Sequence, residues 1–325
     1  MKSVRLSAEK FVICSGSHRV RHRRALPESH SCRYIAPGLS YLSPFTFHLS
    51  PFTFHLSPFT SLHLPPITNH QSPITSIAGR VVYENSTFLV CDKPAHLLIH
   101  PTKPDGPVTL WYQLTQLLAF EIANGGQVSV ITRLDRETSG LVLVAKTHSA
   151  ARDLHTLIER QRLTKRYLAI VWGWPDNNEF EVDYPLLRQG TVAPSKIWLR
   201  QAVHPSGYPS RTRFRVINRF ENPHGKFALV DCEPLTGRTH QIRVHLAFTG
   251  HPIVGDKIYG PDETCYLEFI ETGWTPALAE RLLIGHHALH ASSLAFTLGT
   301  ENFVFNSSLP EDLRTFCLPE TKAEE

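Results

Sequence analysis

The stretch TRLDRETSGLVLVAK, residues 132–146, decides how the fold of this chain is read. It opens with a polar loop in which Asp135 lies between Arg133 and Arg136, and it continues into the apolar run 141–145, which is typical of a buried strand. An arginine beside an aspartate stabilises the ionised carboxylate. The stretch therefore predicts a charged aspartate at a strand edge, available for nucleophilic or base chemistry. A surface loop whose charges pair with one another is the alternative reading.

The chain on both sides of this stretch alternates between strand-like and helix-like patterns. Short apolar runs at 81–83 and 88–91 predict a hairpin, and apolar residues at helical spacing predict helices over 110–122 and 151–158. Further strands are predicted at 141–145, 167–171, 212–216, 227–230 and 288–296. Hairpins outnumber strand–helix–strand units, so we expect an α+β fold with a mixed, mostly antiparallel sheet and helices packed on it.

The first 77 residues are repetitive and rich in proline, and they lack the strand and helix patterns of the rest of the chain. The heptapeptide LSPFTFH occurs at 42–48 and again at 49–55, and the proline in each copy excludes a continuous helix. We predict that residues 1–77 form a low-complexity, disordered extension, and that residues 78–325 form one mixed α/β domain. The arginines near the N-terminus leave open an organellar transit peptide, and a non-functional extension is the alternative.

The positive charge of the chain is confined to this extension. The 325 residues include 33 Lys and Arg and 29 Asp and Glu, a net charge of +4. Residues 1–77 hold eight of the basic and two of the acidic residues, which leaves 25 basic and 27 acidic residues after position 77. A nucleic-acid-binding surface in the domain must therefore come from local clustering of arginine and lysine, not from the overall charge.

Cysteine usage and hydropathy indicate the compartment. Six cysteines are scattered without a C-x-x-C pair, which predicts free thiols in a reducing environment. No apolar run approaches the ~20 residues that span a bilayer. We therefore expect a cytoplasmic protein without a membrane partner.

The Asp135 stretch and four further sequence blocks, which follow one another along the chain in the family's order, resemble motifs of the RluA-type RNA pseudouridine synthase family. The resemblance covers most of residues 81–298 and is carried by the Asp135 stretch together with FLVCDKPA (88–95), KRYLAIVWG (165–173), LTGRTHQIRVHLA (235–247) with GHPIVGD (250–256), and LHA (289–291). It implies the pseudouridine synthase fold, with its mostly antiparallel sheet. It also implies an isomerase that detaches the base of a flipped uridine, rotates it and rejoins it through carbon, without any cofactor.

The resemblance implies a role for each of five residues. Asp135 would be the catalytic group, Tyr167 would stack on the flipped base, and Arg243 would pair with Asp135 and keep it ionised. Arg133 would fill the gap that the flipped base leaves, or pair with a nearby acid. Arg238 would contact a phosphate or support the fold.

One position departs from the family's pattern, and some alternatives stay open. Thr132 stands where many relatives have His, so substrate handling there is expected to differ. The implied partner is structured RNA, rRNA or tRNA, bound by a monomer, and a catalytically inactive RNA-binding module with the same fold is the alternative function. Arginines at 160–166 and 211–219 would line an RNA groove or form a solvated face. The 19 histidines lack recognisable metal-ligand spacing, so no metal is expected.

Overall fold

The computed structural model describes residues 76–103 and 106–318. The disordered extension predicted for residues 1–77 lies outside this range except for its last two residues. Ile77, which the predicted boundary places in the extension, is buried and begins a 3-10 helix, η1 (Ile77–Arg80). None of the helices in the described ranges is long and apolar enough to cross a membrane.

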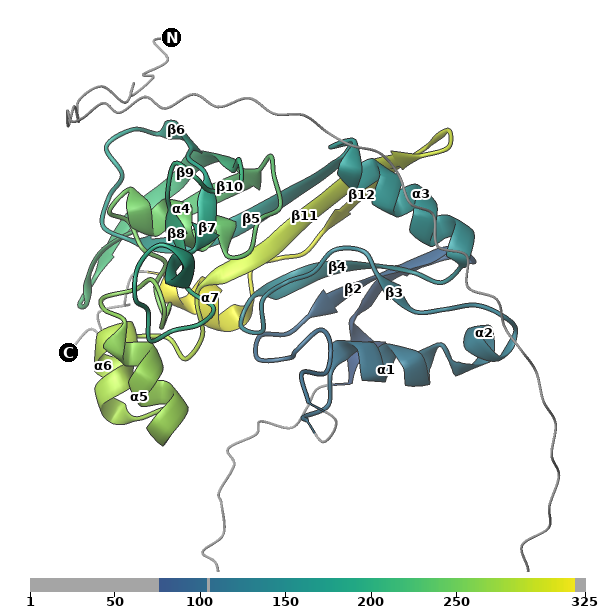
Figure 1. The fold of residues 1–325 in the computed structure, drawn as a ribbon, viewed down its shortest axis with the longest axis horizontal. Coiled ribbons are helices and arrows are strands. Elements are labelled where there is room, and N and C mark those ends of the chain that lie inside the picture. Colours follow the sequence, from purple (N-terminus) through teal and green to yellow (C-terminus); the bar gives the residue numbers. More distant parts are fainter. Residues whose placement is uncertain (1–75, 104–105, 319–325) are drawn as a thin grey trace, which may run out of the picture. The chain divides into compact units, whose positions relative to one another are not determined.

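One large sheet forms the centre of the domain, and its two halves meet at strand β11 (Figure 1). The order of the strands is β1-β2-β4-β11-β5-β10-β9-β6, with β3 added to β4 and β12 added to β11. The strands are β1 (Val81–Glu84), β2 (Phe88–Lys93), β3 (Ser129–Val130), β4 (Ser139–Ala145), β5 (Leu163–Trp172), β6 (Glu179–Asp183), β9 (Arg211–Asn222), β10 (Gly225–Pro234), β11 (Leu289–Leu298) and β12 (Glu301–Asn306). All pairings are antiparallel except that of β4 with β11, which confirms the predicted fold class.

The helices cover the faces of the sheet and begin at threonine caps in several places. They are α1 (Leu110–Leu117), α2 (Ala119–Ala123), α3 (His148–Glu159), α4 (Gln241–Phe248), α5 (Thr264–Thr272), α6 (Pro276–Leu282) and α7 (Glu311–Phe316). The hydroxyls of Thr109, Thr147 and Thr275 accept a hydrogen bond from the third backbone N–H that follows, which satisfies a donor that the helix leaves free. The single helix predicted over 110–122 is instead two helices, interrupted at Leu118.

A second, small sheet lies beside α4. It consists of β7 (Leu186–Arg188) and β8 (Gln201–Val203), with the 3-10 helix η2 (Gln189–Thr191) between them. We call residues 186–208 the β7–β8 hairpin. Figure 1 shows β7 and β8 next to α4, and the structure has contacts between β8 and α4.

Strand β4, the apolar run of the opening stretch, is buried along its whole length because helices cover both of its faces. Leu141 and Leu143 face the side of α3, in one core cluster with Leu154. Val142 and Val144 face the other side, in the cluster that α1 supplies. Side chains alternate along a strand, so a continuous apolar run is needed to fill both faces.

The junction of the two sheet halves depends on Gly140. β4 runs parallel to β11 for only two residue pairs, Ser139 with His290 and Gly140 with Ala291, and β12 then takes the place beside β11. Gly140 has φ +109°, and a β-carbon there would lie 2.3 Å from the carbonyl oxygen of Ala291. Only glycine permits this backbone conformation and this approach. The loop that carries Asp135 therefore enters the sheet at the point where its halves part.

Candidate active site

Asp135 lies on the loop between β3 and β4 and is held by an arginine of α4. Nη1 of Arg243 donates to Oδ2 of Asp135 over 2.8 Å, across 108 residues of sequence. The Arg243 side chain is buried, whereas that of Asp135 is 31% exposed, so one face of the carboxylate remains open. The predicted pairing of the two residues is present in the structure.

A second carboxylate fixes Arg243 in place. Asp256 binds it through two hydrogen bonds, from Nε over 2.6 Å and from Nη2 over 2.9 Å. Asp256 is itself oriented by the backbone N–H groups of Ile258 and Tyr259. Because Asp256 occupies Nε and Nη2 of Arg243, only Nη1 is available to Asp135.

The charge on Asp135 follows from these contacts. Burial would raise the pKa of Asp135, but the charges of His240 and Arg243 outweigh it and lower the pKa to about 2. His240 contributes only where it is protonated, and burial lowers its own pKa to about 4. At neutral pH Arg243 is therefore the cation that keeps Asp135 ionised.

His240 precedes α4 in a strained conformation. Its φ of 56° places it in the left-handed region, which non-glycine residues rarely occupy. Its Nε2 lies 3.8 Å from Oδ2 of Asp135, and its Nδ1 lies 2.8 Å from the hydroxyl of Tyr259. The His240 ring thus lies between the Asp135 carboxylate and Tyr259, and it is hydrogen-bonded to Tyr259.

Three further contacts hold the loop that follows Asp135. The buried Nζ of Lys93 donates to the carbonyl of Arg136 over 3.1 Å. Lys257 donates to both carboxylate oxygens of Glu137, over 2.8 and 2.9 Å. The Thr138 hydroxyl is 2.6 Å from Nε2 of His287. Arg136, Glu137 and Thr138 are therefore each bound to a different part of the chain before β4 begins.

Tyr167 lies on β5, in the core cluster that Leu134 of the loop packs against. Burial raises the pKa of Tyr167, and the charge of Asp135 raises it further, so its phenol is neutral. Tyr167 therefore belongs to the core that supports the Asp135 loop, although 32 residues separate the two residues in the chain.

The other predicted residues have different surroundings. Arg133 is exposed and has no hydrogen bond or ion pair with any described residue. Arg238 is exposed too; its Nε donates to the carbonyl of Pro209 over 3.2 Å, and its guanidinium lies 5.7 Å from the ring centroid of Tyr208. Thr132 is buried, and its hydroxyl accepts the N–H of Leu143 over 2.8 Å, a structural contact within the sheet.

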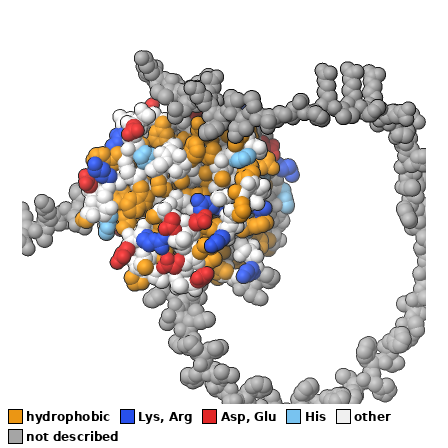
Figure 2. Space-filling view, turned by 60° about the vertical axis from the view of Figure 1, so that its left-hand side comes forward, with side chains coloured by type: hydrophobic (Ala, Val, Ile, Leu, Met, Phe, Trp, Pro, Cys, Tyr) orange, Lys and Arg blue, Asp and Glu red, His pale blue; other side chains and the backbone are white. Residues whose placement is uncertain are grey.

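The predicted arginine stripe on β9 is largely neutralised. Arg211, Arg213 and Arg215 are exposed as expected, but Glu181 of β6 binds the first two and Asp231 of β10 binds the third. Asp231 also binds Arg166. Figure 2 shows one face of the molecule, where Lys and Arg side chains lie among Asp and Glu side chains.

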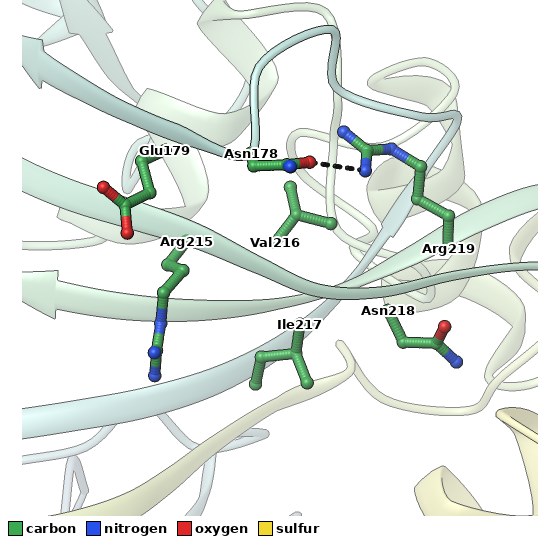
Figure 3. A pocket seen from close by; sticks show the side chains of 7 residues that line it. All are labelled: Asn178, Glu179, Arg215, Val216, Ile217, Asn218 and Arg219. Atoms are coloured by element: carbon green, nitrogen blue, oxygen red, sulfur yellow. Dashed lines mark hydrogen bonds between the residues drawn. The ribbon is translucent and has the colours of Figure 1, made fainter. Parts of the chain in front are cut away.

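A shallow pocket of about 710 Å³ lies further along β9 (Figure 3). It is lined by Asn178, Glu179, Arg215, Val216, Ile217, Asn218 and Arg219. Arg219 is held by the side-chain oxygen of Asn178 and the carbonyl of Pro175. None of the lining residues belongs to the Asp135 site. Within the described ranges, no three His, Cys, Asp or Glu residues are placed to hold a metal ion.

The sequence prediction missed several members of the site. Asp256 and His240 were inside the quoted motifs, but a role for them follows only from their contacts with Arg243 and Asp135. Lys93 and Glu137 were also visible in those motifs. A charged residue in an otherwise apolar or glycine-rich block, such as Asp256 in GHPIVGD, is the signal that could have identified it.

Taken together, the fold and the site define a mixed-sheet domain with one partly open, ionised aspartate fixed by a buried arginine. The family model described as RNA pseudouridylate synthase matches residues 87–248. A ribosomal large subunit pseudouridine synthase C of Escherichia coli K12 is 35% identical over 238 residues, covering 73% of this chain and 68% of that protein. The chain therefore belongs to the RNA pseudouridylate synthase family, which confirms the RluA-type resemblance.

Other comparisons agree. Ribosomal large subunit pseudouridine synthases D of Haemophilus ducreyi and Nitrosomonas europaea are 37% and 33% identical over 55% and 72% of this chain. The chain spans 52% and 63% of the length of these two relatives. Human RNA Pseudouridylate Synthase Domain Containing 1 superposes with a TM-score of 0.55 at 26% identity, covering 70% of this chain and 82% of that one.

Proposed function

We propose that this chain is an RNA pseudouridine synthase that isomerises one uridine of a structured RNA, with Asp135 as its catalytic group. The observation that carries the proposal is the Arg243-fixed carboxylate of Asp135, which is ionised and still partly exposed. Ribosomal RNA is the favoured substrate class, because the bacterial relatives are named as ribosomal large subunit synthases. Within this proposal the enzyme is a cytoplasmic monomer that needs no cofactor.

The isomerisation of uridine needs an ionised group beside the ribose and a flat surface for the base, and Asp135 and Tyr167 can provide them. The reaction breaks the bond between N1 of uracil and C1′ of the ribose and forms a bond between C5 and C1′. The C5 proton is released to water and N1 takes up a proton, so substrate and product are isomers. Asp135 would act on the ribose of the flipped nucleotide while Arg243 holds the carboxylate in one direction. The neutral Tyr167 ring would stack on the uracil, which permits the base to rotate because stacking demands no directional hydrogen bond.

The remaining candidate residues would act on the RNA outside this centre. Arg133 is free to enter the space that the flipped base leaves, since no described residue pairs with it. Arg238 would contact a phosphate beside the target. These two roles depend on the base-flipping step and not on the chemistry at Asp135.

The test is Asp135→Asn, which keeps the shape of the side chain and removes its charge. With RNA labelled with tritium at C5 of uridine, we expect tritium release to fall at least about 1,000-fold while RNA affinity changes little. Asp153→Asn, an exposed acid of α3, is the matched control and should release tritium normally. If Asp135→Asn releases tritium like the unmodified protein, the assignment of Asp135 is wrong. If the unmodified protein binds RNA but releases none from any RNA tested, the inactive-module alternative is correct.

A further inference from the structure

Two aromatic side chains of the β7–β8 hairpin are exposed to an unusual degree. Trp198 is 73% exposed and Tyr208 is 69% exposed. The guanidinium of Arg188 lies 3.5 Å from the ring centroid of Trp198, and that of Arg238 lies 5.7 Å from the centroid of Tyr208. Each ring is thus paired with an arginine on one side, and most of its remaining surface is open. We call these four residues, with Lys196, the hairpin surface.

The aromatic rings are not needed to fix the hairpin in place. Leu186 and Ile197 of the hairpin are buried in a cluster with Val244 of α4 and with Ile258 and Tyr259. These residues seat the hairpin on the helix that carries Arg243. Exposing a large aromatic side chain has no folding advantage, so such a patch on a well-anchored element indicates an interaction site.

The charge of the hairpin surface is not neutralised. The hairpin contains three Lys and Arg residues and no Asp or Glu. Arg200 pairs with Glu263, but Arg188 and Lys196 have no ion pair with any residue in the described ranges. This is the reverse of the β9 stripe, where carboxylates of neighbouring strands meet each arginine. An uncompensated basic surface favours a polyanion over a protein patch of ordinary composition.

Direct contacts connect the hairpin to the site. The backbone N–H of Gln201 in β8 donates to the Tyr259 hydroxyl over 2.8 Å, and the same hydroxyl bonds to His240. His240 lies against Asp135. On the other side, Arg238 bonds to the carbonyl of Pro209 at the end of the hairpin. The hairpin surface and the Asp135 site are therefore connected by a short run of direct contacts.

We propose that the hairpin surface binds unpaired nucleotides of the substrate RNA next to the target uridine. Bases would stack on Trp198 and Tyr208, and the basic side chains would contact phosphates. Stacking on aromatic rings suits single strands because every base has a flat face. The inference rests on the proposed function, since it takes the RNA at this surface to be the RNA that Asp135 modifies.

The experiment compares two labelled probes by fluorescence anisotropy: an RNA hairpin with a single-stranded uridine extension, and the same hairpin without it. We expect the unmodified protein to bind the extended probe more tightly. Trp198→Ala combined with Tyr208→Ala should weaken binding of that probe about tenfold or more, and should leave binding of the short probe nearly unchanged. Trp198→Phe, which keeps an aromatic face, should retain most of the affinity.

Phe120→Ala provides the matched control, because Phe120 is 79% exposed on α2 but lies on the other half of the sheet. It should bind both probes normally. The proposal is overturned if the Trp198 and Tyr208 variants bind the extended probe like the unmodified protein, or if Phe120→Ala weakens it equally. It is also overturned if these variants keep RNA affinity but dissociate a dimer in light scattering, which would identify a protein interface.

Failure of the inference is distinguishable from failure of the proposed function. If Trp198 is needed for binding but no RNA yields tritium release, the isomerase proposal fails and the surface binds RNA for another purpose. If tritium release depends on Asp135 but neither its KM nor RNA affinity depends on Trp198 and Tyr208, the isomerase proposal survives and the hairpin surface is not its RNA contact. In the expected result, KM rises in the double variant while kcat at saturating RNA is retained.

Discussion

The loop that carries Asp135 and the β7–β8 hairpin both present charged side chains, but those charges have different partners. Around Asp135 the buried charges of Arg243, Asp256 and Lys257 are met by opposite charges at 2.6 to 2.9 Å. On the hairpin, Arg188 lies on an aromatic ring and no described carboxylate reaches it. Buried charges that are paired hold a fixed geometry, which a catalytic centre requires. Charges near the surface without a carboxylate partner are available to a polyanion. The two regions should therefore respond differently to mutation, pH and salt.

The largest expected effect comes from breaking the buried network. Arg243→Met leaves Asp135 and Asp256 without their counter-charge, and we expect it to lower the free energy of unfolding by about 3–5 kcal/mol. Urea denaturation followed by circular dichroism measures this change. Arg213→Met removes an exposed arginine from its pair with Glu181 and is the control, with an expected loss of no more than about 1 kcal/mol. If both variants lose the same free energy of unfolding, a buried ion pair contributes no more to stability here than an exposed one, and the prediction is wrong.

A smaller effect concerns pH, through His245 of the same helix. His245 is buried between the Thr212 hydroxyl at 2.9 Å and the carbonyl of Tyr184 at 3.1 Å, and burial lowers its pKa from 6.5 to about 4. The unfolded chain binds a proton there near pH 6.5 and the folded chain does not. The stability that results is fully present above pH 6.5 and is lost as the pH falls through about 4.

The variant His245→Gln tests this, because glutamine can keep a donor and an acceptor but does not titrate. Between pH 7 and pH 4 we expect it to lose less stability than the unmodified protein, by up to about 3 kcal/mol. Denaturant midpoints across that range give the slope. If stability falls with pH in parallel for the two proteins, His245 binds a proton in the folded protein as readily as in the unfolded chain, and the lowered pKa is wrong.

The smallest expected effect distinguishes Arg188 of the hairpin surface from the ion-paired arginines of β9. Arg188→Ala should reduce the slope of log affinity for RNA against log salt concentration by about 0.7 to 1, because a free charge is lost. Arg213→Ala should change that slope much less, since Glu181 and Glu233 already meet its charge. Titrations of one RNA probe at several salt concentrations measure both. If Arg213→Ala changes the salt slope more than Arg188→Ala does, the β9 arginines and not the hairpin surface carry the available positive charge.

The sequence was a good guide where one residue type is required by local geometry. The buried strand after Asp135 was predicted from its continuous apolar run, and the structure has it as β4. The pairing of Arg243 with Asp135 came from the family resemblance, and the structure has it. The prediction of one continuous helix over 110–122 was wrong. The apolar residues keep their helical spacing, but the helix is interrupted at Leu118, where no glycine or proline signals an end.

What the sequence could not supply is the register between distant strands. Arg213 lies opposite Glu181 on one side and Glu233 on the other, and Arg215 lies opposite Asp231. Those pairings turn an apparent basic stripe into a set of ion pairs. The sequence did not reveal the hairpin surface either, because a single tryptophan or tyrosine in a sequence is more often a core residue than an exposed one. Only the structure shows that Leu186 and Ile197 fill the hairpin's contact with α4 and leave Trp198 and Tyr208 exposed.

The parallel pairing of β4 with β11 at Gly140 has a consequence for how the protein is made. The strand that follows Asp135 gains this neighbour only when residues 289–291 have been synthesised, some 150 residues later. Arg243, Asp256 and His287 also come from the second half of the chain. On the ribosome, a growing chain therefore carries Asp135 without its partners until nearly all of the domain has emerged. The site around Asp135 therefore acquires its complete set of contacts only after the C-terminal strands have been synthesised.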